Sequence, residues 1–469
     1  MEITNTLTKQ KEEFTPRAGK TVKMFVCGPT VYDYIHIGNA RTFLFFDVVA
    51  KYLRHRGYQV EYIQNITDLD DKIIERAKRK TDPTADIAAS VLALAKEYTE
   101  LFREDVLALG ITAVDKYAAA TDHIKEVVAQ VRRLIDKGNA YQIEGDGWYF
   151  DLSTFSDYGK LSGRTTQMAE DAVSRIDDPP AGGPNKHNKG DFALWKFSKP
   201  GEPSWESELS RGRPGWHIED TAITEKYFGP QYDLHGGGQD LIFPHHEAEI
   251  AQQESASGLK PFVKYWLHVG FVVNNKAKMA KSAGNFTILH ELLPKYPREV
   301  LRFYLLSAHY RSPLDFSDDQ LKSAEAAVQR IGEFIQRLKQ TGAKENETDK
   351  ELLASFEKEM DDDFNTPRAL AVIFETIKKA NVEIDTGNLS AEAASSLLGQ
   401  LLAINEILGI VPSQGPAIPD KVKQLVIQRE QFRQTKDFTQ ADQLRDRLSA
   451  LGWRVDDTAY GPLAKPIKK

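Results

Sequence analysis

One stretch of the sequence places a glycine turn, a cysteine and a histidine between an apolar strand pattern and a helix pattern. It spans residues 25–42, and its His-Ile-Gly-Asn segment stands where the helix is expected to begin. Phosphates bind at such positions, because backbone N–H groups and the positive end of the helix dipole point at the ligand. The stretch predicts a nucleotide site at His36 and Asn39, with Cys27 in a metal site beside it. The alternative is that His36 caps the helix and Cys27 is a small buried apolar residue.

A second group of candidate residues lies at 233–250. Three consecutive glycines at 236–238 let a backbone approach a ligand closely, since glycine has no Cβ atom. Pro244 suits the first turn of a helix. His245 and Glu249 then lie on one helical face, because residues four apart share a face. His246 and Glu247 are expected to point elsewhere. A surface ion pair is the simplest use of His245 and Glu249.

A basic loop is expected at residues 276–285. It carries Lys276, Lys278 and Lys281 together with a serine and a glycine. Such a loop could close over a polyanion. Taken alone, it also fits a solvated surface loop.

Composition limits the kinds of protein that the chain can be. It has 469 residues, 41% of them hydrophobic, which is enough for several packed cores. The net charge of −7 excludes a basic nucleic-acid coat, so any bound nucleic acid must meet local basic patches. The single cysteine excludes an intramolecular disulfide. The first residues lack the apolar core of a signal peptide, and no apolar run is long enough to span a bilayer. We therefore expect a cytoplasmic protein without membrane partners.

Up to about residue 115, strand and helix patterns alternate. Such alternation predicts a parallel sheet with crossover helices and a binding crevice at the carboxyl ends of its strands. Residues 65–68 fall on that edge. Strands are predicted at 22–26 and 60–64, and helices at 40–55, 70–80 and 87–107.

The pattern changes at about residue 116. A helix at 123–137, a strand at 148–151 and a breaker cluster at 177–184 indicate a block inserted between two halves of the sheet domain. From about 321 the sequence becomes helical and highly charged, as in an antiparallel bundle. A linker is expected at 415–419. The helices predicted in this part are 322–341, 350–361, 367–380, 391–408, 421–435 and 439–451.

The order of the motifs carries more information than any one motif. A His-x-Gly-Asn turn, followed some 240 positions later by Lys-Met-x-Lys-Ser, resembles the two signature motifs of class I aminoacyl-tRNA synthetases. Segments 27–33, 65–72, 213–219 and 243–247 resemble cysteinyl-tRNA synthetases, and this resemblance covers nearly the whole chain. Two segments, 219–222 and 246–249, look most like the archaeal-type branch of that family.

The resemblance implies activation of L-cysteine with ATP and Mg²⁺, followed by transfer of the cysteinyl group to the 3′ end of tRNA-Cys. The first step needs positioning and stabilisation of phosphate charge, with no covalent enzyme intermediate. His36 and Asn39 would contact the phosphates, and Lys278 and Lys281 would neutralise charge. Asp240 is a candidate ribose contact. The other residues expected at the nucleotide are Gly28, Thr30, Gly38, Gly236, Gly237 and Gly238.

A zinc ion is implied by the same resemblance. Cysteine and serine differ only by sulfur for oxygen, which shape alone discriminates weakly, whereas zinc prefers a thiolate to a hydroxyl. The family's ligands carried onto this chain are Cys27, Asp220, His245 and Glu249. The residues that match the family's amino-acid pocket are Thr67, Trp216 and His235, beside Cys27.

The sequence departs from the family pattern at three places. Asp220 stands where many bacterial members have cysteine, which makes the metal site harder and serine rejection less strict. Ala280 replaces a usual serine, with both lysines kept. Residues 461–465 lack the Trp-Arg pair of many members, which puts their part in anticodon reading in doubt.

The resemblance implies an α/β fold, with a Rossmann-type parallel-sheet catalytic domain, an inserted connective domain, an α-helical bundle and a small C-terminal domain. We expect a monomer. Two alternatives stay open: a related ligase that passes activated cysteine to an amino sugar, and an inactive RNA- or metal-binding paralogue. The expected bounds are 1–115 and 214–255 for the two halves of the catalytic domain, 116–213 for the inserted domain, 256–320 for a stem-contact region with the Lys-Met-x-Lys-Ser loop, 321–412 for a tRNA-binding bundle and 413–469 for an anticodon-binding module.

Overall fold

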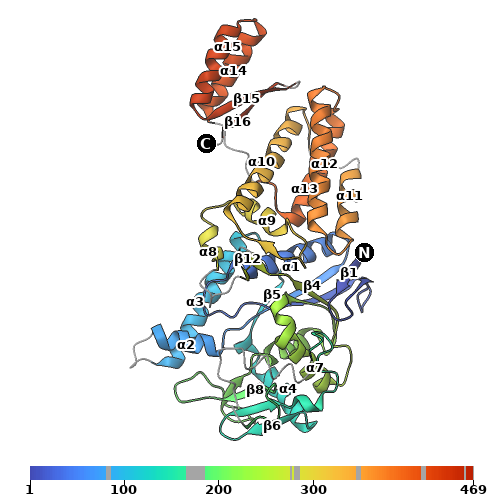
Figure 1. The fold of residues 1–469 in the computed structure, drawn as a ribbon, viewed down its shortest axis with the longest axis vertical. Helices are drawn as coiled ribbons and strands as arrows, with labels where there is room; N and C mark the ends of the chain where they lie inside the picture. Colours follow the sequence, from blue (N-terminus) through green and yellow to red (C-terminus); the bar gives the residue numbers. More distant parts are fainter. Residues whose placement is uncertain are drawn as a thin grey trace. The chain divides into compact units, whose positions relative to one another are not determined.

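The computed structural model describes residues 1–80, 86–164, 185–274, 277–278, 286–344, 350–412, 419–458 and 461–467. The chain divides into two compact units (Figure 1). The first comprises Met1–Arg298, Ala308–Ser317 and Asp361–Phe364, and the second comprises Glu299–Ser307, Asp318–Met360 and Asn365–Lys469. Within the described residues, no helix is both long and apolar enough to cross a membrane.

A five-stranded parallel sheet forms the centre of the first unit, which confirms the α/β class. Its strand order is β11-β10-β3-β4-β5. Most residues of β3, β10 and β11 are buried, as expected for a parallel sheet covered on both faces. The strands are β3 (Thr21–Val26), β4 (Gln59–Ile66), β5 (Lys116–Ala119), β10 (Tyr232–Gly238) and β11 (Val263–Val269).

Helix α1 (Ile37–His55) connects β3 to β4 and is buried along most of its length. It lies so close to β10 that a Cβ atom on Gly236 would be 2.1 Å from Cζ of Phe46. Gly236 is therefore needed for helix–sheet packing. The further helices of this region are α2 (Asp71–Lys80) and α3 (Ile87–Ala108), close to the predicted bounds.

The two edge strands of the sheet lie outside the ranges expected for the catalytic domain. β5 begins at Lys116, one residue past the expected end at 115, and β11 lies beyond 255. β5 has only four residues, too few to show a strand pattern in the sequence.

The inserted block folds as a four-stranded antiparallel sheet of order β6-β7-β8-β9. Its strands are β6 (Ala140–Ile143), β7 (Gly147–Phe150), β8 (Phe192–Phe197) and β9 (Gly212–Pro214). Apolar residues of this sheet share one buried core with α4 (Ile124–Asp136), α6 (Ile218–Phe228) and α7 (Glu247–Ser257). The predicted breaker cluster at 177–184 lies outside the described residues.

Small strands complete the first unit. β1 (Glu2–Asn5) pairs with β2 (Gln10–Glu13), and β12 (Val272–Asn274) pairs with β13 (Ala277–Lys278) and β14 (Leu314–Asp315). A short helix, α8 (Leu289–Leu292), follows the predicted basic loop.

The second unit is mainly helical, as the charged sequence predicted. In each long helix the buried residues recur at helical spacing, as on one face of an amphipathic helix. Trp453–Thr458 and Gly461–Pro466 form the antiparallel ribbon β15–β16, which was not predicted. The helices are α9 (Arg298–Leu306), α10 (Asp318–Gln340), α11 (Glu351–Met360), α12 (Thr366–Asp385), α13 (Ala391–Leu408), α14 (Asp420–Gln434) and α15 (Phe438–Ala450).

Candidate active site and metal centre

A pocket of about 520 Å³ opens where β3, β4 and β10 end. This is the edge at which parallel sheets bind ligands. The predicted site residues that line it are Cys27, Gly28, Thr30, His36, Gly38, Asn39, Thr67, Trp216, Asp220, Gly238, Asp240 and His245.

Several predicted residues do not line this pocket. Gly236 packs on Phe46, and a Cβ on Gly237 would meet the imidazole of His246 at 2.8 Å. His235 and Glu249 are fully buried behind the pocket wall. The structure describes Lys278 only as backbone in β13, and Lys281 lies outside the described residues.

The His-x-Gly-Asn turn forms a capping box at the start of α1. The backbone N–H of Asn39 donates to Nδ1 of His36 at 3.1 Å, and the backbone N–H of His36 donates to Oδ1 of Asn39 at 3.4 Å. Because Nδ1 accepts a hydrogen bond, the proton of a neutral His36 ring is on Nε2. His36 is thus both a helix cap and a pocket residue, so the two alternatives for this motif are not exclusive.

The segment after the basic loop returns to this turn. The backbone N–H of Ile37 donates to the carbonyl of Thr287 at 2.9 Å, and that of Leu289 donates to the carbonyl of Ile35 at 3.0 Å. Thr287 and Leu289, which follow the loop in the sequence, are thereby fixed next to His36.

Four predicted metal ligands converge at the base of the pocket. Oδ2 of Asp220 lies 3.2 Å from Sγ of Cys27 and 3.0 Å from Nε2 of His245. Oε1 of Glu249 lies 3.1 Å from the same nitrogen of His245 and 3.9 Å from Sγ of Cys27. All four side chains are buried, and their donor atoms lie within 4.8 Å of one another.

The electrostatics of this cluster fit a bound cation. Burial, together with the charges of Asp220 and Glu249, raises the pKa of the Cys27 thiol well above its usual value. Burial and the Asp220 charge likewise raise the pKa of Glu249. Oδ1 of Asp220 and Oε2 of Glu249 are buried without a hydrogen-bond partner. Among the described residues, neither carboxylate pairs with a lysine or an arginine, so a divalent ion would satisfy groups that the protein leaves uncompensated.

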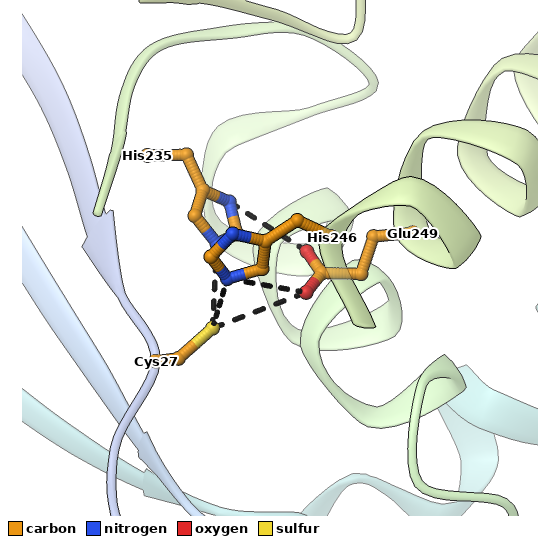
Figure 2. A group of neighbouring side chains, drawn as sticks. All are labelled: Cys27, His235, His246 and Glu249. Carbon is orange, nitrogen blue, oxygen red and sulfur yellow. Dashed lines mark hydrogen bonds and ion pairs between the residues drawn. The ribbon is translucent and has the colours of Figure 1, made fainter. Parts of the chain in front are cut away.

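A second set of possible ligands shares Cys27 and Glu249 with the first. Figure 2 shows His235 and His246 facing the sulfur of Cys27, with Nε2–Sγ distances of 3.3 and 3.1 Å. His235 and His246 are fully buried and do not line the pocket, whereas Asp220 and His245 do. Three members of the Asp220–His245 set therefore reach the pocket, whereas only Cys27 of the other set does, and this favours the Asp220–His245 set as the one that meets a substrate.

The expectation that His246 points away from the site is wrong. It assumed that His245 and His246 lie in the same α-helix as Glu249. Instead, α7 begins at Glu247, and the preceding π-helical turn, η5 (Ile242–His246), contains Phe243 with non-helical angles of φ −142° and ψ 131°. The tandem histidines were the available signal, but the kink cannot be recognised from helical spacing.

Further histidines support the ligands from behind. Nδ1 of His217 lies 2.8 Å from Nδ1 of His245, and Nδ1 of His246 lies 2.8 Å from Nε2 of His268. Burial holds the pKa of His217, His246 and His268 below the usual value, so these rings are neutral. Hydrogen bonds of this kind fix the orientation of a ligand ring.

Thr67 and Trp216 form the pocket wall beside the four predicted metal ligands. Oγ1 of Thr67 donates to Oε2 of Glu219 at 2.9 Å, and the ring of Trp216 stacks on His245 with a centroid distance of 4.4 Å. Burial, followed by the charge of Asp220, raises the pKa of Glu219 well above its usual value. Glu219 was not predicted as a site residue, although it belongs to the segments 213–219 and 219–222 that carry the family resemblance.

Comparisons with known proteins agree with this geometry. The family described as "tRNA synthetases class I (C) catalytic domain" matches residues 13–326, and the "DALR domain" matches residues 355–412. A cysteine–tRNA ligase of Carboxydothermus hydrogenoformans is 44% identical over 476 residues, which cover 98% of this chain and 99% of that protein. One from Caldicellulosiruptor saccharolyticus is 43% identical over 479 residues, covering all of both chains.

A solved structure shares the fold at low identity. Mycobacterium tuberculosis methionyl-tRNA synthetase in complex with methionyl-adenylate has a TM-score of 0.61 and 16% identity, covering 87% of this chain and 94% of that one. The two cysteine–tRNA ligases come from bacteria and give no support to the archaeal-type branch that the sequence suggested.

Proposed function

The chain belongs to the cysteine–tRNA ligases of class I, and we propose that it activates cysteine in the pocket between Cys27, His36 and Trp216. As an enzyme of this family it joins cysteine to tRNA in two steps, with ATP as the energy source. The assignment of individual residues below is our proposal. The convergence of Cys27, Asp220, His245 and Glu249 at the base of the pocket supports it most strongly.

In the first step, the carboxylate of cysteine attacks the α-phosphate of ATP, and pyrophosphate leaves. His36 offers its Nε2–H, and the first turn of α1 offers backbone N–H groups, where negative charge develops on phosphate. Lys278 and Lys281 neutralise the leaving pyrophosphate, and Mg²⁺ bound with ATP supplies further positive charge. Gly238 and Asp240 take the adenosine end of the pocket.

Cys27, Asp220, His245 and Glu249 hold a metal ion, which we propose to be zinc. When bound, the zinc ion would act as a Lewis acid that prefers a thiolate ligand to a hydroxyl ligand. Thr67 and Trp216 orient the amino acid beside it, and His235 supports Cys27 from behind. Asp220 is a harder ligand than cysteine, so we expect lower metal affinity and less strict rejection of serine.

In the second step, a terminal hydroxyl of tRNA-Cys attacks the carbonyl of the cysteinyl-adenylate, and AMP leaves. We assign tRNA contacts to 256–320 and to the bundle at 321–412, and anticodon binding to 413–469. The DALR match at residues 355–412 supports the assignment of the bundle. The proposed enzyme is a cytoplasmic monomer.

Transfer of cysteine to an amino sugar and an inactive paralogue are the rival functions. Similarity to cysteine–tRNA ligases over 98% of the chain, with a long helical unit that a small acceptor would not need, disfavours the amino-sugar ligase. The test is to supply radiolabelled cysteine and ATP with either tRNA-Cys or an amino sugar. We expect label in tRNA alone. Label in the sugar would support the rival ligase, and label in neither would support the paralogue.

A further inference from the structure

Lys72 is a cation on the pocket wall without an ion-pair partner among the described residues. It is exposed and lines the pocket from the first turn of α2. Its backbone N–H donates to Oδ1 of Asp70 at 2.9 Å. Its ammonium group, however, forms no ion pair or hydrogen bond with any residue in the described ranges. No other lysine and no arginine lines this pocket within the described part of the chain.

Neighbouring cations, by contrast, are paired. Nζ of Lys196 lies 2.5 Å from Oδ2 of Asp71, and Arg213 binds the other oxygen of the same carboxylate. Arg76 donates to both oxygens of Asp33 at 2.8 and 3.1 Å. The unpaired state of Lys72 is therefore not a general feature of this surface.

The contacts of Asp71 place Lys72 at the amino-acid end of the pocket. Arg213, which binds Asp71, lies in β9, three positions before Trp216. Trp216 stacks on the metal-site residue His245. On the other side, Lys72 lies in the first turn of α2, five positions after Thr67, which directly follows β4. Lys72 is thus tied to the wall made by Thr67 and Trp216.

The residues assigned so far leave one anionic group of the substrates, the α-carboxylate of cysteine, without a partner in the protein. The thiolate of cysteine meets the metal site, and the phosphates of ATP meet His36 and the basic loop. The α-carboxylate of cysteine must lie between these two ends, because its oxygen attacks the α-phosphate. A carboxylate drawn from water into the pocket needs a cation or several hydrogen-bond donors.

We propose that Lys72 binds the α-carboxylate of the substrate cysteine and holds it toward the α-phosphate of ATP. The contact between Lys72 and the α-carboxylate exists before that carboxylate attacks the α-phosphate. Once the mixed anhydride forms, the former carboxylate is neutral, and the ammonium group faces only the remaining charge of the α-phosphate. Lys72 therefore acts mainly on binding of cysteine. This inference rests on the proposed site and deepens it, since it names the residue that recognises the backbone of the amino acid.

The test compares cysteine with cysteamine, which keeps the thiol and the amine but lacks the carboxylate. In ATP–pyrophosphate exchange, Lys72→Met should raise the KM for cysteine about tenfold to a hundredfold. The Ki of cysteamine as a competitor should change less than about twofold, since that ligand never met Lys72. Lys72→Arg, which keeps the charge, should recover part of the loss. An unchanged Ki for cysteamine also shows that Lys72→Met is folded.

Lys78→Met is the matched control. Lys78 lies on the same helix and pairs with Glu202 at 3.4 Å, away from the pocket, so this variant should keep wild-type constants. An equal loss for cysteine and cysteamine, an increase confined to the KM for ATP, a defect confined to tRNA transfer, or no change at all would each overturn the proposal. Absence of cysteine-dependent exchange in the wild type would instead overturn the proposed site itself.

Discussion

Nε2 of His245 lies 3.0 Å from Oδ2 of Asp220, although the two residues belong to η5 and α6 and the strand β10 separates them in the sequence. This contact brings a nitrogen and a hard oxygen donor to one point in front of Cys27. Ligand softness at that point sets how strongly the site prefers thiolates. We therefore propose that Asp220 is the residue through which this chain tunes its selectivity for cysteine over serine.

Replacement of this ligand should strengthen the metal site. We expect Asp220→Cys to bind zinc about tenfold more tightly or better, because a thiolate is a softer donor than a carboxylate. The same variant should discriminate more strongly against serine. Competition with a chelator of known affinity measures the first effect. Asp220→Asn is the control, since it keeps the shape and removes the charge, and it should bind zinc more weakly than the wild type. Equal affinity in all three proteins would show that Asp220 is not a ligand.

The hydroxyl of Thr67 is expected to matter for both stability and cysteine binding. Thr67→Val removes the donor to Glu219 and leaves a buried carboxyl group without its partner, which should cost about 1–3 kcal/mol of unfolding free energy. The KM for cysteine should rise, because the wall beside the metal site loses its anchor. Thr67→Ser keeps the hydroxyl and should retain most of the stability and most of the affinity for cysteine. Urea unfolding measures the change in stability, and ATP–pyrophosphate exchange measures the KM for cysteine. A Thr67→Val protein with wild-type stability and kinetics would refute the proposed role of the Thr67 hydroxyl.

Glycines of β10 should separate into packing and ligand positions. Gly236→Ala would press against Phe46 and should destabilise the protein by about 1–3 kcal/mol. Gly238→Ala instead places its Cβ 2.6 Å from Oδ1 of Asp240 at the pocket, so it should mainly raise the KM for ATP. Denaturant unfolding and exchange kinetics of both variants test this division. A stable Gly236→Ala protein with impaired ATP binding would reverse it.

The Asp71 ion pairs should stabilise the protein only at moderate and high pH. Burial alone would raise the pKa of Asp71, but the charges of Arg213 and Lys196 lower it overall. A carboxylate with a depressed folded pKa stabilises the fold above its unfolded pKa of about 3.9, and this contribution is lost as the pH falls through the folded value.

Asp71→Asn should therefore cost up to about 1 kcal/mol at pH 7, since the carboxylate is half exposed. The difference from the wild type should shrink as the pH falls below about 4. Urea unfolding at several pH values measures it. Glu75→Gln, in the exposed pair with Arg79 on the same helix, is the control and should have little effect. A cost for Asp71→Asn that persists or grows in acid would contradict the ion-pair account.

The sequence predicted the elements that repeat a strong local pattern. Helix α13 was predicted at its observed bounds, 391–408, and the structure shows a serine N-cap before it and a glycine C-cap after it. Cys27, His36 and Asp220 were assigned to one site through the resemblance to cysteinyl-tRNA synthetases, and all three line one pocket in the structure.

Features that depend on tertiary structure were not predicted. His246 faces Cys27 only because the chain is kinked at Phe243, and Gly236 packs closely on Phe46 of helix α1. The ribbon β15–β16 is stabilised by cross-strand pairing between segments with no clear alternation. Such features follow from packing between distant residues, which a local pattern does not contain.

The most direct test of the metal-based selection of cysteine is ATP–pyrophosphate exchange with cysteine and with serine, on protein whose zinc content has been assayed. We predict much stronger exchange with cysteine than with serine, with loss of the cysteine-dependent exchange after chelation and in Cys27→Ala. Exchange with cysteine that survives chelation, or equal exchange with serine, would contradict the account.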